Sequence, residues 1–292
     1  IGSKTFIVDV INLIRAGKRV VAMIAPAVEG QFGPDITMAS WRTALKKIGF
    51  ADMIEVALGG DMTAAAEAEE WAEAYKEGKK MTTSCCPAFV NMIKQHFPML
   101  LDNMSTTVSP MCGVSRMIKA EDPETVTVFI GPCIAKKSET MDLNIQGNAD
   151  YAMTLGEIRA MMRAKGVELE PEENTLQNGS VFGKRFGNGG GVTAAVLQCL
   201  KEQGENADIN VMKCNGAAEC KKALLFMKVG KLPADFVEGM ACVGGCVGGP
   251  SKHKTEQEAK KARDTLIGQA DKREVHENLG HYPMDKFSMH RH

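Results

Sequence analysis

The residues of this chain best suited to metal chemistry are cysteines in three short motifs. The motifs are "TSCCPAF" with Cys85 and Cys86, "IGPCIAKK" with Cys133, and "EGMACVGGCVGGP" with Cys242 and Cys246. A cubane of four iron atoms is held by four thiolates, and Cys86, Cys133, Cys242 and Cys246 supply that number. Cys85 is then left as a free thiol beside the cluster.

Each motif taken alone has a plainer interpretation. A Cys-x3-Cys between glycines also suits a zinc half-site or a tight turn, and a cysteine before a basic helix is commonly structural. The chain has nine cysteines in all, and an odd number argues against a disulfide framework. The remaining four have no partner motif, and we expect core or surface thiols at Cys112, Cys199, Cys214 and Cys220.

Alternating strands and helices must position these motifs. Apolar, β-rich runs predict strands over 19–26, 52–58, 125–132, 208–214 and 235–242. Helices are predicted over 36–50, 61–78, from Pro87, and over 109–120, 154–165, 192–204, 216–229 and 255–270. This alternation is typical of an α/β fold with parallel sheets covered on both faces. Ligands bind at the carboxyl ends of such strands, so the three motifs can converge on one site.

The expected organisation is one domain with two lobes, over about 1–165 and about 166–270. The least regular segment, 166–186, is a candidate link between the lobes. The helix over 255–270 is highly charged and is expected to face solvent, and the C-terminal tail over about 271–292 reads as an extended surface segment.

Composition narrows the classes of partner. The formal net charge of −1 provides no field that would gather nucleic acid or an anionic membrane, so neither is expected to bind. No apolar run approaches the ~20 residues that span a bilayer, and no secretion signal precedes the first strand, so a cytoplasmic chain is expected. Ile1 stands where a start methionine would, which indicates a piece of a longer protein.

Together and in this order, the three motifs resemble the signature segments of the iron-only (FeFe) hydrogenases, from "IAPAVEGQFG" to "GGCVGGP". The resemblance implies a catalytic domain of two lobes, each a mainly parallel twisted sheet flanked by helices, with the cofactor between them. That cofactor is an H-cluster, a 4Fe-4S cubane joined through one cysteine to a di-iron subsite with CO, cyanide and azadithiolate. The implied reaction is the reversible reduction of protons to H2.

The resemblance also implies partners and roles. Electrons come from a ferredoxin-type carrier or a fused ferredoxin-like domain, which is expected upstream and missing from this chain, and maturases insert the di-iron subsite. Cys86, Cys133, Cys242 and Cys246 match the cubane ligands, with Cys246 bridging to the di-iron subsite. Cys85 matches the proton-donating thiol, and Lys136 a donor to a cyanide ligand. The matching pocket walls are Ala25, Pro26, Pro132, Phe186 and Met240.

The same resemblance implies a proton relay. Ser105, twenty residues beyond Cys85, matches the family's relay serine. Glu67 and Glu70 lie three apart on one predicted helix face and match its two glutamates, with Glu70 expected as the inner acid. Most such pairs on helices are simply solvated, so this assignment depends on the resemblance.

Several positions depart from well-known members. Ala88 and Phe89 replace Gly-Trp, Gly131 and Met111 replace a methionine and a glutamine near the pocket, and Ala74 replaces an arginine supporting the relay. These features resemble the clostridial group B subgroup. The alternative functions are an iron-sulfur assembly factor or an H2-sensing module that binds only a cubane, and a zinc-binding structural protein. Cys85 and Lys136 argue against the first, and Cys85 against the second.

Overall fold

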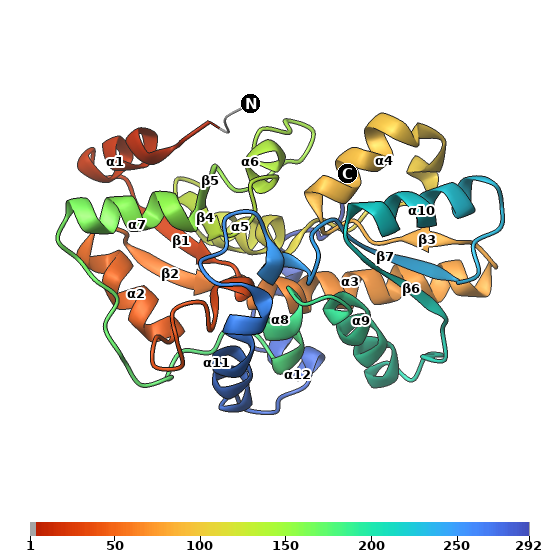
Figure 1. The fold of residues 1–292 in the computed structure, drawn as a ribbon. Coiled ribbons are helices and arrows are strands. Elements are labelled where there is room, and N and C mark those ends of the chain that lie inside the picture. Colours follow the sequence, from red (N-terminus) through yellow and green to blue (C-terminus); the bar gives the residue numbers. More distant parts are fainter. Residues whose placement is uncertain (1–3, 292) are drawn as a thin grey trace.

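Two parallel β-sheets form the framework of the computed structural model, which describes residues 4–291 (Figure 1). The first sheet has the order β2-β1-β4-β5, with β1 at Val20–Ile24, β2 at Asp52–Glu55, β4 at Val126–Gly131 and β5 at Tyr151–Thr154. The second has the order β3-β7-β6, with β3 at Met81–Thr82, β6 at Val211–Asn215 and β7 at Phe236–Met240. All strand pairs in both sheets are parallel.

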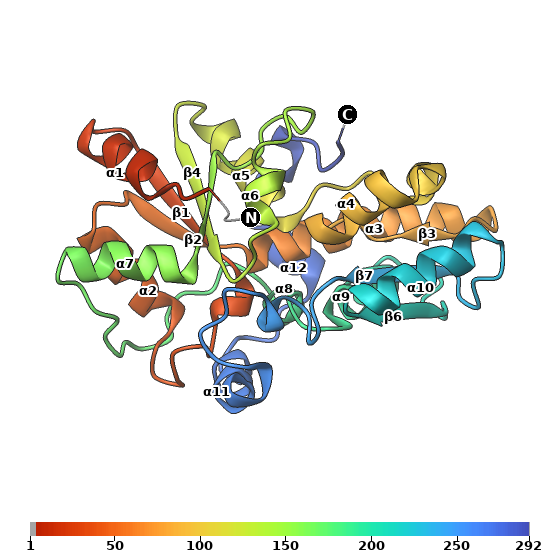
Figure 2. The ribbon, with the colours of Figure 1, turned by 45° about the horizontal axis from the view of Figure 1, so that its top comes forward.

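Helices cover both sheets (Figure 2). The first is packed by α1 (Ile7–Arg15), α2 (Met38–Lys47), α5 (Pro110–Glu121) and α7 (Leu155–Ala164). On the second, side chains alternate along β7. Phe236 and Met240 join a core with α3 (Ala57–Lys76) and α9 (Gly191–Glu202), whereas Val237 joins one with α4 (Pro87–His96) and α10 (Ala217–Lys228). Period-two alternation therefore divides the second lobe into two core layers.

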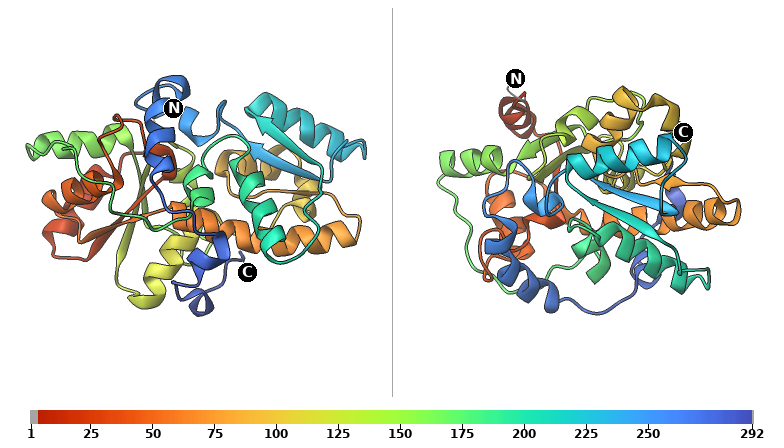
Figure 3. Two further views of the ribbon diagram at one scale, coloured as in Figure 1. Left: turned by 90° about the horizontal axis from the view of Figure 1, so that it is seen from below. Right: turned by 45° about the vertical axis from the view of Figure 1, so that its right-hand side comes forward.

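The long helix α3 joins the lobes, because it packs against α5, α9 and α8 (Val181–Arg185). The later helices α11 (Glu256–Gly268) and α12 (Val275–Leu279) lie beneath this junction (Figure 3). The short helix α6 spans Lys136–Glu139, and 3-10 turns span Pro26–Val28, Pro98–Asn103, Cys246–Gly248 and Met284–Lys286. Among the described residues, no helix is long and apolar enough to cross a bilayer.

The predicted α/β class with parallel sheets is confirmed, and the predicted strands and helices are present with ends shifted by a few residues. The lobes are not consecutive segments divided near residue 165, however. The strand β3 pairs with β7, so residues 81–82 lie in the second sheet although β4 and β5 of the first sheet follow them. A two-residue strand carries no periodicity that would assign it to a sheet.

Two expectations about the C-terminal region are wrong. The tail is not an extended surface segment, because Val275 and Leu279 are buried and the Val108 amide donates to the Met289 carbonyl at 2.7 Å. Helix α11 is not simply solvated either, since its Arg263 is only 3% exposed. In both segments a few inward-facing residues stand among many charged ones, which hides the buried face from a count of charges.

One close contact fixes α4 on the second sheet. Gly239 of β7 faces Phe89 of α4, and a Cβ at Gly239 would lie 2.1 Å from the Phe89 ring. Phe89 itself is fully buried. The ring packs directly on the strand backbone that leads to Cys242, so this pair sets the distance between α4 and β7.

We predict that Gly239→Ala lowers the free energy of unfolding by about 1–3 kcal/mol, because the added methyl overpacks the core. Urea unfolding measures this change. Gly268→Ala, where no atom lies within 4 Å of the added Cβ, is the control and should be close to neutral. Adding Phe89→Leu should make the double variant less destabilised than the sum of the two single changes. Strict additivity would contradict the contact.

Candidate functional site

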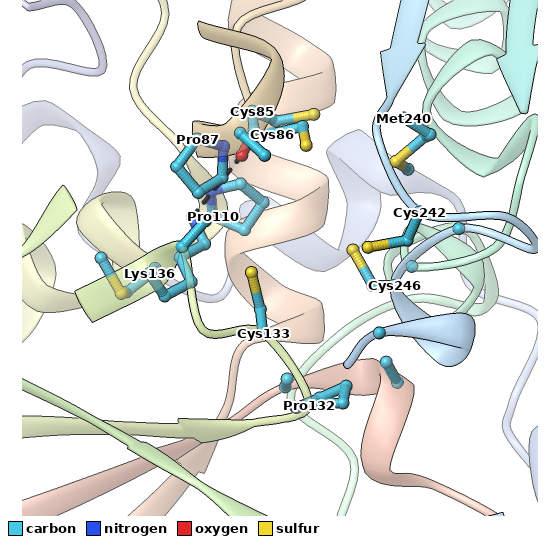
Figure 4. A pocket seen from close by; sticks show the side chains of 18 of the residues that line it. Cys85, Cys86, Pro87, Pro110, Pro132, Cys133, Lys136, Met240, Cys242 and Cys246 are labelled. Carbon is cyan, nitrogen blue, oxygen red and sulfur yellow. Dashed lines mark hydrogen bonds between the residues drawn. The ribbon is translucent and has the colours of Figure 1, made fainter. Parts of the chain in front are cut away.

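A cavity lies between the two sheets, at the carboxyl ends of their strands (Figure 4). Its volume of about 150 Å³ far exceeds the roughly 10–15 Å³ that one water needs. The sequence-predicted residues that line it are Ala25, Pro26, Cys85, Cys86, Pro132, Cys133, Lys136, Phe186, Met240, Cys242 and Cys246. Glu67, Glu70 and Ser105 are not among the lining residues. Strand order explains the convergence, because β1 and β4 are neighbours at the switch point of the first sheet.

Cys85 and Cys86 reach the cavity from β3. The strand's pairing continues past Thr82, since the Thr83 amide donates to the Val237 carbonyl at 3.0 Å. The Thr83 hydroxyl oxygen also accepts from the Gly239 amide at 3.1 Å. Cys86 has an extended backbone immediately before Pro87, the first residue of α4. The two cysteines are therefore fixed between a strand and a helix rather than on a free loop.

Cys133 reaches the cavity from β4, through Gly131 and Pro132. A Cβ at Gly131 would lie 2.8 Å from the Ala25 side chain, so the glycine lets the ends of β1 and β4 approach closely. The Pro132 carbonyl accepts from the Ser251 amide at 2.9 Å, which ties this turn to the chain beyond Cys246. Burial raises the pKa of Cys133 to about 11.

Cys242 and Cys246 lie in a glycine turn after β7. Gly245 has a φ of 76° and almost touches Gly187, whose carbonyl would lie 2.6 Å from an added Cβ. The Cys246 amide donates to that same carbonyl at 2.8 Å, and Asn188 forms an antiparallel bridge with Gly245. Residues 187–188 thus position the last cysteine. Phe186 is the one residue of this loop that the sequence predicts for the pocket, whereas Gly187 and Asn188 are not predicted, although the run "GNGGG" is a signal for a close turn.

Arg263 of α11 supports the cavity from behind. Its guanidinium donates to the Lys184 carbonyl at 2.6 Å, to Asn188 Oδ1 at 3.0 Å and to the Pro26 carbonyl. One buried side chain therefore ties the Pro26 wall to the loop that holds Cys246. No local pattern predicts this role, because Arg263 stands in a helix full of exposed charges.

The cysteines fit an iron-sulfur cluster. Burial is the largest cause that raises the pKa values of Cys85, Cys242 and Cys246, so these thiols keep their protons until a cationic group joins them. Within residues 4–291, no three His, Cys, Asp or Glu side chains are close enough to hold a single metal ion. Figure 4 shows the thiol of Cys133 on one side of a space and those of Cys242 and Cys246, from one turn, on the other. This arrangement suits a cluster in which each thiolate binds a different iron.

Lys136 is a buried cation on the cavity wall. Its Nζ donates to Glu139 Oε2 at 2.6 Å and to the Cys85 carbonyl at 3.5 Å. Burial acts to lower the pKa of Lys136, but the Glu139 carboxylate outweighs burial, so the pKa is raised and the ammonium is kept. Glu139 also accepts from the Ser109 hydroxyl at 2.5 Å. Glu139, which lies one turn along α6 from Lys136, is not among the residues predicted from the sequence.

The expected order of the two relay glutamates is wrong. Glu67 is fully buried, and its Oε1 accepts from the Ser84 amide at 3.1 Å. Burial is the main cause that raises the pKa of Cys85, and Glu67, when ionised, lies close enough to raise it further. Glu70 lies one helical turn further from the cavity and accepts from the Thr106 amide at 3.1 Å. Glu67 is therefore the inner acid and Glu70 the outer one. A helix face gives the spacing of two residues but not which of them is nearer the site.

Ser105 stands beside Glu67. Burial raises the pKa of Glu67 to about 8, and the Ser105 side chain partly offsets this rise as a hydrogen-bond partner. Glu67 Oε2 nevertheless has no well-formed hydrogen bond to any described residue. A buried carboxyl with a vacant oxygen and a pKa near neutrality can hold a proton and release it.

The four remaining cysteines are core thiols. Cys112, Cys199, Cys214 and Cys220 are buried and free. Cys214 and Cys220 are hydrogen-bonded to each other, between β6 and α10. None of the four lines the cavity.

Comparisons with known proteins agree with this geometry. Residues 18–250 match the family described as "Iron only hydrogenase large subunit, C-terminal domain". Iron hydrogenase 1 of Clostridium pasteurianum is 30% identical over 89% of this chain and 56% of its own length. The periplasmic [Fe] hydrogenase large subunit of Nitratidesulfovibrio vulgaris is 28% identical over 85% of this chain and 72% of its own length. A probable cytosolic Fe-S cluster assembly factor of Brugia malayi is 23% identical over 75% of this chain and 59% of its own length.

The fold has close structural relatives. A variant of the [FeFe]-hydrogenase HydA1 from Chlamydomonas reinhardtii superposes with a TM-score of 0.75 at 20% identity, covering 97% of this chain and 93% of that one. The chain spans only 56% of Iron hydrogenase 1, the first of the curated relatives above.

Glu67→Gln should change how stability depends on pH in the metal-free protein. The folded-state pKa of Glu67 is raised from 4.5 to about 8, so its stabilising contribution is fully present below about pH 4.5 and is lost as the pH rises to about 8. Relative to the variant, the wild type should therefore lose free energy of unfolding between about pH 5 and pH 8, as measured by urea unfolding. Glu69→Gln, on the exposed side of the same helix, controls for the loss of a carboxylate. A difference that stays flat with pH would contradict the prediction.

Proposed function

The chain belongs to the iron-only hydrogenase large-subunit family, and from this premise we propose that it reversibly reduces protons to H2 at an H-cluster. The observation that carries the proposal is the convergence of five cysteines on one cavity. Four of them suffice as ligands, and the fifth, Cys85, has the buried acid Glu67 behind it. The family and its relatives support a hydrogenase-type oxidoreductase.

In this proposal Cys86, Cys133, Cys242 and Cys246 would hold the cubane, and Cys246 would also serve as the link to a di-iron subsite with CO, cyanide and azadithiolate. When bound, the H-cluster supplies the metal centre at which protons and electrons combine. Ala25, Pro26, Pro132, Phe186 and Met240 form a largely apolar wall around it, which excludes bulk water. A dry wall strengthens every charge interaction inside the site.

Lys136 would donate a hydrogen bond to an anionic ligand of the cofactor, such as cyanide. An ammonium is a strong, charge-assisted hydrogen-bond donor, and the pair with Glu139 fixes where it points. Nζ has three donor hydrogens, and its contacts to Glu139 and the Cys85 carbonyl use two of them. The third remains for the cavity.

Cys85 delivers protons, and Glu67, Ser105 and Glu70 supply it from outside. At neutral pH burial keeps both the Cys85 thiol and the Glu67 carboxyl protonated, because their pKa values are raised. A proton can therefore be held at Cys85 Sγ and replaced from Glu67 without a lasting buried charge. Ser105, a hydrogen-bond partner of Glu67, is assigned in this proposal as the hydroxyl that passes the proton between the two acids.

The remaining partners follow from the same proposal. The described chain is the H-cluster domain of a cytoplasmic protein, and it receives electrons from a ferredoxin-type carrier or a fused ferredoxin-like domain. Maturases insert the di-iron subsite. The near-zero net charge supports neither nucleic acid nor a membrane as a partner.

The second candidate is an iron-sulfur assembly factor or H2-sensing module that binds a cubane alone, and the similarity to an assembly factor supports it. Such a protein needs the four cubane ligands but neither a proton-donating thiol nor a cation aimed at an anionic ligand. Cys85, backed by Glu67, and Lys136, backed by Glu139, therefore favour the hydrogenase.

Infrared spectroscopy of the fully maturated protein decides between the two candidates. We expect CO and cyanide stretching bands together with H2 evolution from a low-potential reductant. Cys246→Ala should lose the bands, because the bridge to the di-iron subsite is gone, whereas Cys199→Ala, a buried core cysteine outside the cavity, should keep them. A cubane without these bands in the wild type would overturn the di-iron assignment.

Cys85→Ala should keep the infrared bands and lose most H2 turnover, by a factor of about 10²–10⁴, the usual contribution of a positioned proton donor. The rate of H2 evolution measures this loss. Cys112→Ala, which also removes a fully buried thiol but leaves the cavity lining intact, is the control. Unchanged turnover in Cys85→Ala would remove Cys85 from the proton route.

A further inference from the structure

Glu70, the outermost acid of the proposed proton route from Cys85, contacts His290 of the C-terminal segment. His290 Nδ1 lies 3.3 Å from Glu70 Oε1 and 2.9 Å from the Thr106 hydroxyl. The side chain of His290 is 40% exposed, whereas that of Glu70 is 14% exposed. One turn along α3 from Glu70, the chain has Ala74, which offers no polar group. His290 is thus the more solvent-accessible member of the pair.

Backbone contacts hold His290 in this place. It forms an antiparallel bridge with Thr107, and the hydrogen bonds on either side run from Val108 to Met289 at 2.7 Å and from Arg291 to Thr106 at 3.0 Å. Arg116 of α5 donates to the His290 carbonyl at 2.6 Å. The ring position is set by the main chain, so a change of this side chain leaves the segment docked.

The hydrogen bonds also define which ring nitrogen carries the proton. The Thr106 hydroxyl has one hydrogen, which it donates to Glu70 Oε1. The Thr106 amide donates to the same oxygen. The contact between that hydroxyl and His290 must then use a hydrogen on Nδ1. In the neutral ring Nε2 is consequently the basic nitrogen.

We propose that His290 is the residue that exchanges protons between solvent and Glu70, and that Thr106 positions it. This inference rests on the proposed function, because it places His290 at the outer end of the route through Glu70, Ser105 and Glu67 to Cys85. An imidazole suits the position, since its two nitrogens can take up a proton on one side and release one on the other.

The inward step is balanced in protons. Nε2 binds a proton from water, giving an imidazolium. The Nδ1–H bond then breaks as that proton passes to the Thr106 hydroxyl oxygen, while the Thr106 O–H bond breaks and its proton passes to Glu70 Oε1. The ring is left neutral with its hydrogen on Nε2, and Glu70 is left as the neutral acid. Exchange with water at the exposed ring, or a half-turn of the ring, restores the form with hydrogen on Nδ1. The outward step is the reverse.

Variants of the maturated protein test this role. We expect His290→Ala to lower H2 turnover at least about tenfold, less than the loss of an inner group, because Glu70 retains some exposure of its own. Added imidazole should restore part of the rate. His290→Asn retains a hydrogen-bond donor but cannot take up a proton, so it should behave like the alanine variant. Full activity in His290→Asn would make the role purely structural and overturn the proposal.

His276 provides a matched control. It lies in the same C-terminal region, and its side chain is 39% exposed. Its Nδ1 lies 2.6 Å from Glu202 of α9, an acid that is not part of the proposed proton route. His276→Ala should leave turnover unchanged and gain nothing from imidazole. Equal losses in both histidine variants, without rescue, would show a general effect of the tail and contradict the proposal.

A measurement on the metal-free protein separates this inference from the proposed function. Nitrogen-15 NMR of the imidazoles should find neutral His290 protonated at Nδ1, and Thr106→Val should shift it toward the Nε2–H form. An Nε2–H ring that does not respond to Thr106→Val would overturn the inference even if the enzyme is active. An inactive wild type with the Nδ1–H ring in place would instead contradict the proposed function.

Discussion

Four thiols in one apolar cavity cannot ionise together unless a cationic group enters among them. Burial raises the pKa of Cys246, and the neighbouring Cys133 and Cys86 raise it further. The site is consequently built to be completed by metal, since iron replaces the protons of the thiols and removes their mutual repulsion. The permanent charges nearby, such as Lys136 and Arg263, are each matched by a fixed partner and so do not depend on the cofactor.

That constraint explains why so much of the chain is devoted to holding turns still. Each ligand follows a parallel strand, and each turn is tied to another: Cys246 to Gly187, Pro132 to Ser251, and the Pro26 wall to α11 through Arg263. Ties of this kind join both sheets across the cavity. The ligand positions are therefore properties of the whole fold rather than of any one loop.

A cavity that excludes bulk water also needs a route by which protons cross the surrounding protein. The proposed route begins at Cys85 and Glu67, whose pKa values burial raises, and it ends at Glu70, where the C-terminal segment packs. The departures from better-known members also find reasons in packing. Phe89 lies on Gly239, and Gly131 lets β4 approach Ala25.

The sequence by itself determined the architecture and identified the cysteines that meet at the cavity, because three cysteine motifs at strand ends and alternating elements are local patterns. The resemblance to the family also pointed to Lys136 and the wall residues, which line the cavity, and to Ser105, which lies beside Glu67. Only the tertiary structure decided that Glu67 lies nearer the cavity than Glu70 and that β3 pairs with β7. It also brought Arg263, Glu139 and His290 near the site. These depend on contacts between residues far apart in the chain or on which side of a helix is buried. No local pattern encodes such contacts, since they arise only when the core has formed.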